Sequence, residues 1–205
     1  MYFFILLFIG FLLLVHFLSL ALVKRLFDAS FRKGRERSPK DLGIPYQQVH
    51  INSESGKQIF GWYIPAKVSS TSPGIVMIHG QGASADVLLP LIPSLHECGY
   101  ALLLLDARGH GRSSDRKSTS IVTFAQDLEC GLDWMAMQPE VDSLSMALLG
   151  HSLGGASALL VASRRPQLAA VVSISSFAHS VWAIRRRLEN YHIPWWPLGW
   201  WVMHY

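Results

Sequence analysis

Residues 146–158 read MALLGHSLGGASA, a short apolar run that meets a serine between glycines and continues in small residues. A continuous apolar run of this length is typical of a strand buried on both faces of a parallel sheet. A sharp turn from such a strand into a helix exposes a serine hydroxyl. The turn also brings the strand and the helix so close together that only glycine fits where they meet. Gly150 and Gly154 meet this need, so Ser152 is the candidate nucleophile.

The rest of the chain repeats the same alternation of buried strand and helix. Further apolar runs of strand length lie at 74–79, 101–106 and 170–175. Helical spacing of apolar residues is found at 87–98, 122–137 and 153–165. An N-terminal hairpin is expected from strands at 46–52 and 58–64. Buried strands separated by helices predict a mostly parallel sheet with right-handed crossovers, and therefore an α/β fold.

The N-terminus predicts a membrane anchor. Tyr2–Val23 contains 22 residues without a formal charge, and a helix of that length reaches roughly 33 Å, enough for a hydrocarbon core of about 30 Å. A cleaved signal peptide is the rival interpretation, but no Lys or Arg precedes the run and Ser19-Leu20-Ala21 is a weak cleavage site. We expect residues 1–23 to form an uncleaved single-pass transmembrane anchor.

The charge of the chain is concentrated just after this segment. The net charge is +4, and residues 24–41 account for all of it. Residues 24–45 are therefore interpreted as a basic juxtamembrane linker, which the positive-inside rule places in the cytoplasm together with the domain that follows. Because the remaining charges balance, a nucleic-acid-binding face is not expected. The two cysteines, Cys98 and Cys130, belong to no Cys/His cluster, so no metal site is predicted.

Two further motifs follow predicted strands. His79-Gly80-Gln81-Gly82 begins at the end of the run at 74–79, and residues 106–113 (DARGHGRS) begin at the end of the run at 101–106. With the glycine-flanked serine, these motifs resemble those of the α/β-hydrolase superfamily, and particularly its membrane-anchored esterases, lipases and aminopeptidase-like serine hydrolases. All three motifs stand at the carboxyl ends of parallel strands, where open α/β sheets bind their ligands. The resemblance covers residues 46–180, the predicted hydrolase core.

The resemblance implies a reaction. Ser152 would attack an ester, thioester or amide carbonyl, and water would then release the acyl group without a metal or an organic cofactor. The backbone N–H groups of Gln81 and Leu153 would stabilise the oxyanion, each worth roughly 2.7–4 kcal/mol in the transition state. Asp106 is expected to organise its own loop through Arg108 or nearby backbone. The residues expected to support the motifs structurally are Gly150, Gly154, His79, Gly80, Asp106, Arg108, Gly109, His110 and Gly111.

The chain departs from the family pattern after the serine. Family members place an acid and then a histidine there, because a serine needs a base and the base needs an orienting acid. Glu189 is the only acidic residue that follows Ser152, and the histidines are His179, His192 and His204. Residues 181–205 resemble the beginning of a lid, so we expect a chain that ends inside the lid and lacks the last strands.

This departure leaves three functional hypotheses open. The first is a membrane-anchored serine hydrolase acting on small acyl substrates, which the anchor suggests are lipid-like. The second is a catalytically inactive relative that binds acyl ligands or a partner at the membrane. The third is completion in trans, in which a second chain covers the open sheet edge at 170–175 and supplies the missing groups, since an uncovered apolar edge favours aggregation.

Overall fold

The computed structural model describes residues 2–28, 37–53, 56–67, 71–114, 119–190, 192 and 194–196. The chain divides into two compact units, of which one combines Met1–Ser30 with His179–Tyr205 and the other is Phe31–Ala178. The expected linker and the expected lid segment each lie partly outside the described residues. The candidate nucleophile belongs to the second unit.

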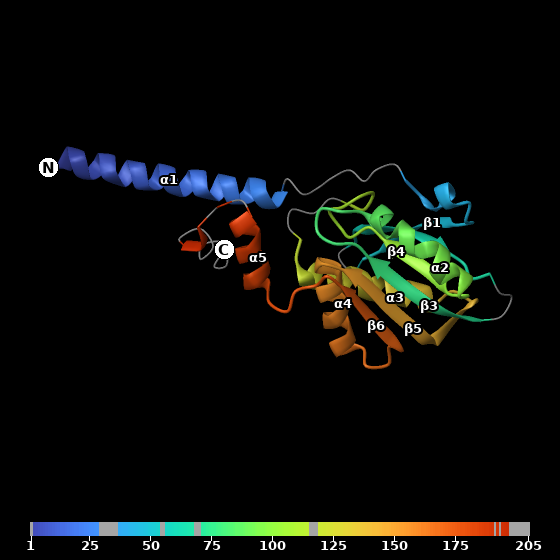
Figure 1. Ribbon diagram of the computed structural model, residues 1–205. Helices are drawn as coiled ribbons and strands as arrows, with labels where there is room; N and C mark the ends of the chain where they lie inside the picture. Colours follow the sequence, from blue (N-terminus) through green and yellow to red (C-terminus); the bar gives the residue numbers. More distant parts are fainter. Residues whose placement is uncertain are drawn as a thin grey trace. The chain divides into compact units, whose positions relative to one another are not determined.

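A mostly parallel sheet forms the centre of the second unit (Figure 1). Its described strands are β1 (Gln47–Asn52), β2 (Gln58–Ile64), β3 (Ser72–Ile78), β4 (Ala101–Leu105), β5 (Val141–His151) and β6 (Ala170–Ile174). They are ordered β1-β2-β4-β3-β5-β6, and β1 pairs with β2 and β2 with β4 in antiparallel fashion, whereas all later pairs are parallel. The predicted N-terminal hairpin and the predicted parallel sheet are both confirmed.

Helices cover both faces of this sheet. Helices α3 (Ile121–Ala136) and α4 (Leu153–Arg164) pack on one face, and η2 (Ala85–Leu91) and α2 (Ile92–Glu97) pack on the other. Successive residues of β3 alternate between the two cores, because side chains of a strand point to opposite faces. Val76 is buried with α3 and α4, and Met77 is buried with η2 and α2. The sequence therefore builds three layers, as an α/β fold requires.

The helix predicted at 87–98 is corrected by the structure. This segment forms the 3₁₀ helix η2, followed by the short α-helix α2. Pro90 lies inside η2, and Pro93 lies in the first turn of α2. Proline has no backbone N–H and clashes with the preceding turn of an α-helix, so it divides the segment where the apolar spacing alone indicates one helix.

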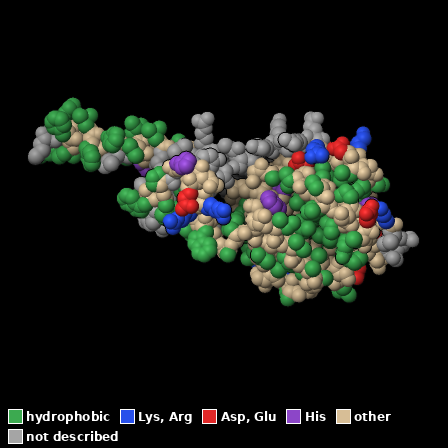
Figure 2. All heavy atoms as spheres, in the orientation of Figure 1, with side chains coloured by type: hydrophobic (Ala, Val, Ile, Leu, Met, Phe, Trp, Pro, Cys, Tyr) green, Lys and Arg blue, Asp and Glu red, His purple; other side chains and the backbone are tan. Residues whose placement is uncertain are grey.

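The first unit contains helices α1 (Tyr2–Asp28) and α5 (Ser180–Asn190). Many large apolar side chains of α1 between Tyr2 and Leu18 are exposed, and Figure 2 shows this apolar surface along the helix. Across the described part of the chain, no helix meets the length and apolarity needed to cross a membrane. The transmembrane character predicted for residues 1–23 is therefore not supported by the structure.

Candidate active site

Ser152 lies at the turn between β5 and α4 in a strained backbone conformation. Its φ is 54° and its ψ is −115°, in the left-handed half of backbone space that a residue with a side chain rarely adopts. Such a conformation costs on the order of 1–3 kcal/mol and persists only where the surroundings enforce it. The Ser152 N–H donates to the carbonyl oxygen of Ile174 on β6 at 2.8 Å, so the neighbouring strand helps to hold the turn.

Close backbone approach explains the glycines around this serine. A Cβ at Gly150 would overlap the Gly154 carbonyl, and a Cβ at Gly154 would overlap the carbonyl oxygen of His79. Gly155 is also needed, because a Cβ there would lie 2.7 Å from Ser173 Oγ. The requirement at Gly155 was not predicted from the sequence, since it arises from packing against β6.

The loop after β3 passes directly beside the candidate nucleophile. A Cβ at Gly80 would lie 3.0 Å from Ser152 Cβ, and Gln81, the next residue, is half-buried. Leu153 is the first residue of α4, and the N–H of a first helical residue has no acceptor within its own helix. The two backbone donors expected for an oxyanion therefore belong to chain segments that flank Ser152.

His79 and His110 are buried beside this loop and act as hydrogen-bond acceptors. His79 Nε2 accepts from the Ala107 N–H at 3.0 Å, and His110 Nε2 accepts from the Gly82 N–H at 3.0 Å. Burial lowers the pKa of each imidazole to about 4, with the neighbouring histidine adding to the effect at His110. Both rings are therefore neutral at pH 7, in which state one ring nitrogen can accept a hydrogen bond.

Asp106 organises two loops through backbone N–H groups. Its carboxylate accepts from the Ala85 N–H at 2.7 Å and from the Arg112 N–H at 2.9 Å. Burial raises the pKa of this carboxyl group, and these two hydrogen bonds partly oppose that rise. Gly111 is required beside it, because a Cβ there would overlap the Asp106 carboxylate and the φ of Gly111 is 51°. Of the two partners expected for Asp106, nearby backbone is the one observed.

Arg108 instead forms a buried ion pair with Asp127 of α3. The Arg108 backbone N–H also donates to Asp127 at 2.8 Å, and its guanidinium donates to Gln126 Oε1 at 3.1 Å. This pair ties the loop after β4 to α3. The role of Asp127 was not predicted from the sequence. A signal was present, because Asp127 is a carboxylate next to Leu128 on the apolar face of the helix predicted at 122–137, and a buried charge needs a partner.

Among the described residues of the second unit, no basic or acidic side chain forms a hydrogen bond with Ser152 Oγ. His151 is half-buried, with Nδ1 3.2 Å from the position of a Cβ at Gly80. Glu189 belongs to the other unit and accepts from Arg185 one turn earlier at 3.0 Å. His204 lies outside the described residues.

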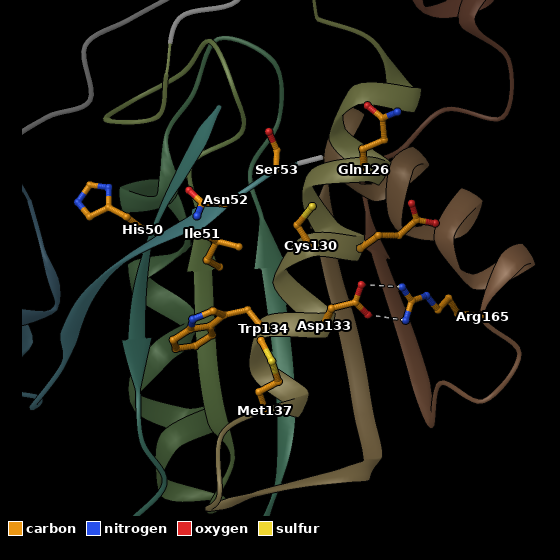
Figure 3. A pocket seen from close by; sticks show the side chains of 11 residues that line it. His50, Ile51, Asn52, Ser53, Gln126, Cys130, Asp133, Trp134, Met137 and Arg165 are labelled. Carbon is orange, nitrogen blue, oxygen red and sulfur yellow. Dashed lines mark hydrogen bonds and ion pairs between the residues drawn. The ribbon is translucent and has the colours of Figure 1, made fainter. Parts of the chain in front are cut away.

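A cavity of about 540 Å³ lies elsewhere, between β1 and α3 (Figure 3). Asp133 and Arg165 form a two-point ion pair at its edge, at 2.7 and 3.1 Å. The residues that line it are His50, Ile51, Asn52, Ser53, Gln126, Glu129, Cys130, Asp133, Trp134, Met137 and Arg165. None of them is a residue predicted for the active site. Among the described residues, no group of three or more His, Cys, Asp or Glu side chains is arranged to hold a metal ion.

Comparison with known proteins supports an α/β-hydrolase fold. The model of the family described as serine aminopeptidase, S33, matches residues 70–198. A proline iminopeptidase of Saccharolobus solfataricus is 37% identical over 156 residues, which cover 72% of this chain and 49% of the relative. The sn-1-specific diacylglycerol lipase ABHD11 of Mus musculus is 33% identical, covering 64% of this chain and 43% of the relative.

A solved structure supports the same architecture. An esterase of Pyrococcus furiosus superposes with a TM-score of 0.70 at 24% identity, over 84% of this chain and 66% of the esterase. The chain spans about half the length of the curated relatives that it matches. The family model covers the strand-end loops and the serine turn together, and so the chain belongs to the α/β-hydrolase superfamily, in the family of serine aminopeptidases, S33.

Proposed function

We propose that this chain is a serine hydrolase that cleaves ester, thioester or amide bonds through an acyl-enzyme on Ser152. The Ser152 hydroxyl attacks the carbonyl carbon, and the N–H groups of Gln81 and Leu153 stabilise the oxyanion that forms. The leaving group departs with a proton, and water then releases the acyl group as a carboxylic acid. The relatives are named a peptidase, a lipase and an esterase, which supports amide and ester bonds; we include thioesters because the same acyl-enzyme chemistry cleaves them.

The strained backbone of Ser152 is the observation that most strongly supports this proposal. A left-handed non-glycine residue at a strand-to-helix turn, enclosed by glycines and with the Gly80 loop beside it, is costly to build. Strain of this kind concentrates at functional sites, where it presents a reactive group in a fixed geometry.

A fluorophosphonate probe tests the nucleophile directly. We expect covalent labelling of the folded chain and complete loss of labelling in Ser152→Ala. Ser163→Ala is a matched control, because Ser163 is an exposed serine on α4 whose hydroxyl donates to the Leu160 carbonyl at 2.7 Å; this variant should label like the wild type. A well-folded wild type that does not react would exclude the hydrolase proposal for this chain.

A catalytically inactive acyl-binding protein is the second candidate. It is favoured by the observation that none of the described residues of the second unit forms a hydrogen bond with Ser152 Oγ, since an unassisted serine hydroxyl is a weak nucleophile. Calorimetry with a fatty acid distinguishes the two. Binding by a chain that the probe does not label would support the inactive candidate, and labelling at Ser152 would contradict it.

We also propose that residues 2–23 associate with a lipid membrane and that the substrates are small, lipid-like acyl compounds. The absence of formal charge in this segment and the exposed apolar side chains of α1 support this proposal. The basic residues at 24–41 favour a cytoplasmic position for the hydrolase unit by the positive-inside rule, which we include in this proposal. Resistance to carbonate extraction tests the association. Proteolysis of the unit from outside right-side-out vesicles would contradict the orientation.

A second chain over β6 is a related proposal. Among the described strands, β6 pairs with β5 alone, and Val172 of this strand is 47% exposed. Strand edges of this kind pair readily with another chain. Light scattering should show association that Val172→Lys weakens, and a monomer at all concentrations would contradict the proposal.

A further inference from the structure

We propose that His79 and His110 are positioning residues whose neutral rings hold the N–H of Gln81 toward Ser152. The inference rests on the proposed function, because it assigns a purpose to the two rings only if Gln81 contributes to an oxyanion site. It goes beyond that function in naming two side chains that act through the backbone without touching the substrate. Each ring controls one of the two peptide groups that meet at Gln81.

The first peptide group joins Gly80 to Gln81. Its carbonyl oxygen lies 2.7 Å from His79 Nδ1 and also accepts from the Ala83 N–H at 3.2 Å. In a trans peptide the C=O and N–H bonds point in opposite directions. Because the carbonyl is held on the side of His79, the Gln81 N–H points away from that ring.

The second peptide group joins Gln81 to Gly82. Its N–H donates to His110 Nε2 at 3.0 Å, which prevents this group from rotating. Gln81 is thus fixed from both sides, although its own side chain forms none of these contacts. The positive φ of Gly82, 73°, allows the chain to turn sharply after it.

The loop held in this way lies against the nucleophile turn. The position of a Cβ at Gly80 is 3.0 Å from Ser152 Cβ, and the backbone of His79 contacts Gly154. A rotation of either peptide group would therefore change the donor that faces Ser152 without moving the serine itself.

Packing fixes the two rings in place, and the position of the single ring proton decides which nitrogen of each ring accepts a hydrogen bond. Their centroids lie 5.1 Å apart, and both rings contact the edge or face of Phe124, at 5.7 and 5.3 Å. His79 Nε2 accepts from the Ala107 N–H, so the hydrogen-bond network assigns the single ring proton to Nδ1. The acceptor role of His110 Nε2 assigns its proton to Nδ1 in the same way.

Protonation would break this arrangement, because an Nε2–H would face the N–H of Ala107 or of Gly82. Burial lowers the pKa of both rings to about 4. Asp86 opposes this lowering at His79 and His151 reinforces it. At His110, the neighbouring His79 lowers the pKa and Asp106 raises it. The rings therefore stay neutral across the physiological pH range.

Nuclear magnetic resonance of the whole chain, labelled with ¹⁵N, tests the positioning without requiring activity. We expect both histidines as Nδ1–H tautomers at pH 7, with no titration near pH 6.5. As the pH is lowered toward 4, the chemical shift of the Gly82 amide should follow the protonation of His110. The chemical shift of the Ala107 amide should follow the protonation of His79. An Nε2–H tautomer, or a Gly82 amide that does not respond to His110, would overturn the proposal.

A pair of variants tests the consequence at Ser152. His110→Gln keeps an acceptor near the position of Nε2 and should label with fluorophosphonate at nearly the wild-type rate. His110→Leu removes it and should label about tenfold more slowly, because small displacements of catalytic groups are costly. Equal labelling of His110→Leu and wild type would refute the positioning. Expected amide and tautomer signals in a chain that never labels would support the positioning and refute the hydrolase function.

Discussion

The loops at the carboxyl ends of β3, β4 and β5 differ from the cavity between β1 and α3 in how their polar groups are paired. In the loops, buried side chains such as His110 and Asp106 bind backbone N–H groups. At the cavity, charged side chains pair with one another in contact with solvent, and the Asp133 side chain is 60% exposed. The first arrangement fixes backbone geometry, whereas the second contributes little energy. A hollow surface alone is therefore a poor guide to the reactive site here.

The largest effect is expected at the serine turn itself. Gly150→Ala places a Cβ on the backbone of Gly154 and Gly155, where no flexible side chain can move aside. We expect a loss of at least about 4 kcal/mol in the free energy of unfolding, measured by urea denaturation. Gly99→Ala is not a suitable control because its φ is positive. Ala136→Gly, at the exposed end of α3, should cost about 1 kcal/mol or less.

The buried ion pair should be nearly as sensitive. Asp127→Leu leaves the Arg108 guanidinium buried without its carboxylate, and removal of one partner of such a pair costs roughly 3–5 kcal/mol. Glu129→Leu is the matched control on the same helix, because Glu129 pairs with Arg164 at 3.5 Å near the surface, where such pairs are worth about 0–1 kcal/mol. Equal losses in the two variants would contradict the contrast between loops and cavity.

The next largest effect is expected from acid, which should lower the stability that the buried histidines of the loops contribute. Because the folded pKa of His79 is lowered from 6.5 to about 4, the unfolded chain binds the proton first. The stability contributed by each neutral ring is thus fully present above pH 6.5 and is lost as the pH falls toward 4, by about 3 kcal/mol for His79 and by a similar amount for His110. Asp106, whose folded pKa is raised, acts in the opposite direction. Denaturation midpoints measured from pH 7 to 4 should fall, and should fall less steeply in His110→Gln.

The smallest effect is expected at the cavity. Met137 lines it and is 72% exposed, so Met137→Ser should change the free energy of unfolding by no more than about 0.5 kcal/mol. Fluorophosphonate labelling of Ser152 should be unchanged in this variant. Reduced labelling with intact stability would show that the cavity is connected to the reactive site.

Local pattern was sufficient to predict much of this molecule. Apolar runs located the strands, because a strand that is buried on both faces must consist almost entirely of apolar residues. Helical spacing placed α3 and α4 to within a residue or two. The same spacing failed at residues 87–98, where Pro90 and Pro93 divide the helix. The serine turn was predictable because its glycines and its strand are adjacent in the chain.

Tertiary structure alone decided which distant groups meet. The order of β4 between β2 and β3, the pairing of Arg108 with Asp127, and the contact of His110 with Gly82 all join residues far apart in the sequence. No local pattern contains such partners, because they depend on how the chain crosses over the sheet. The sequence thus determined the type of turn that presents Ser152. The folded sheet decided which side chains hold the loops around this serine, because only packing in three dimensions brings a buried acceptor to a particular backbone N–H.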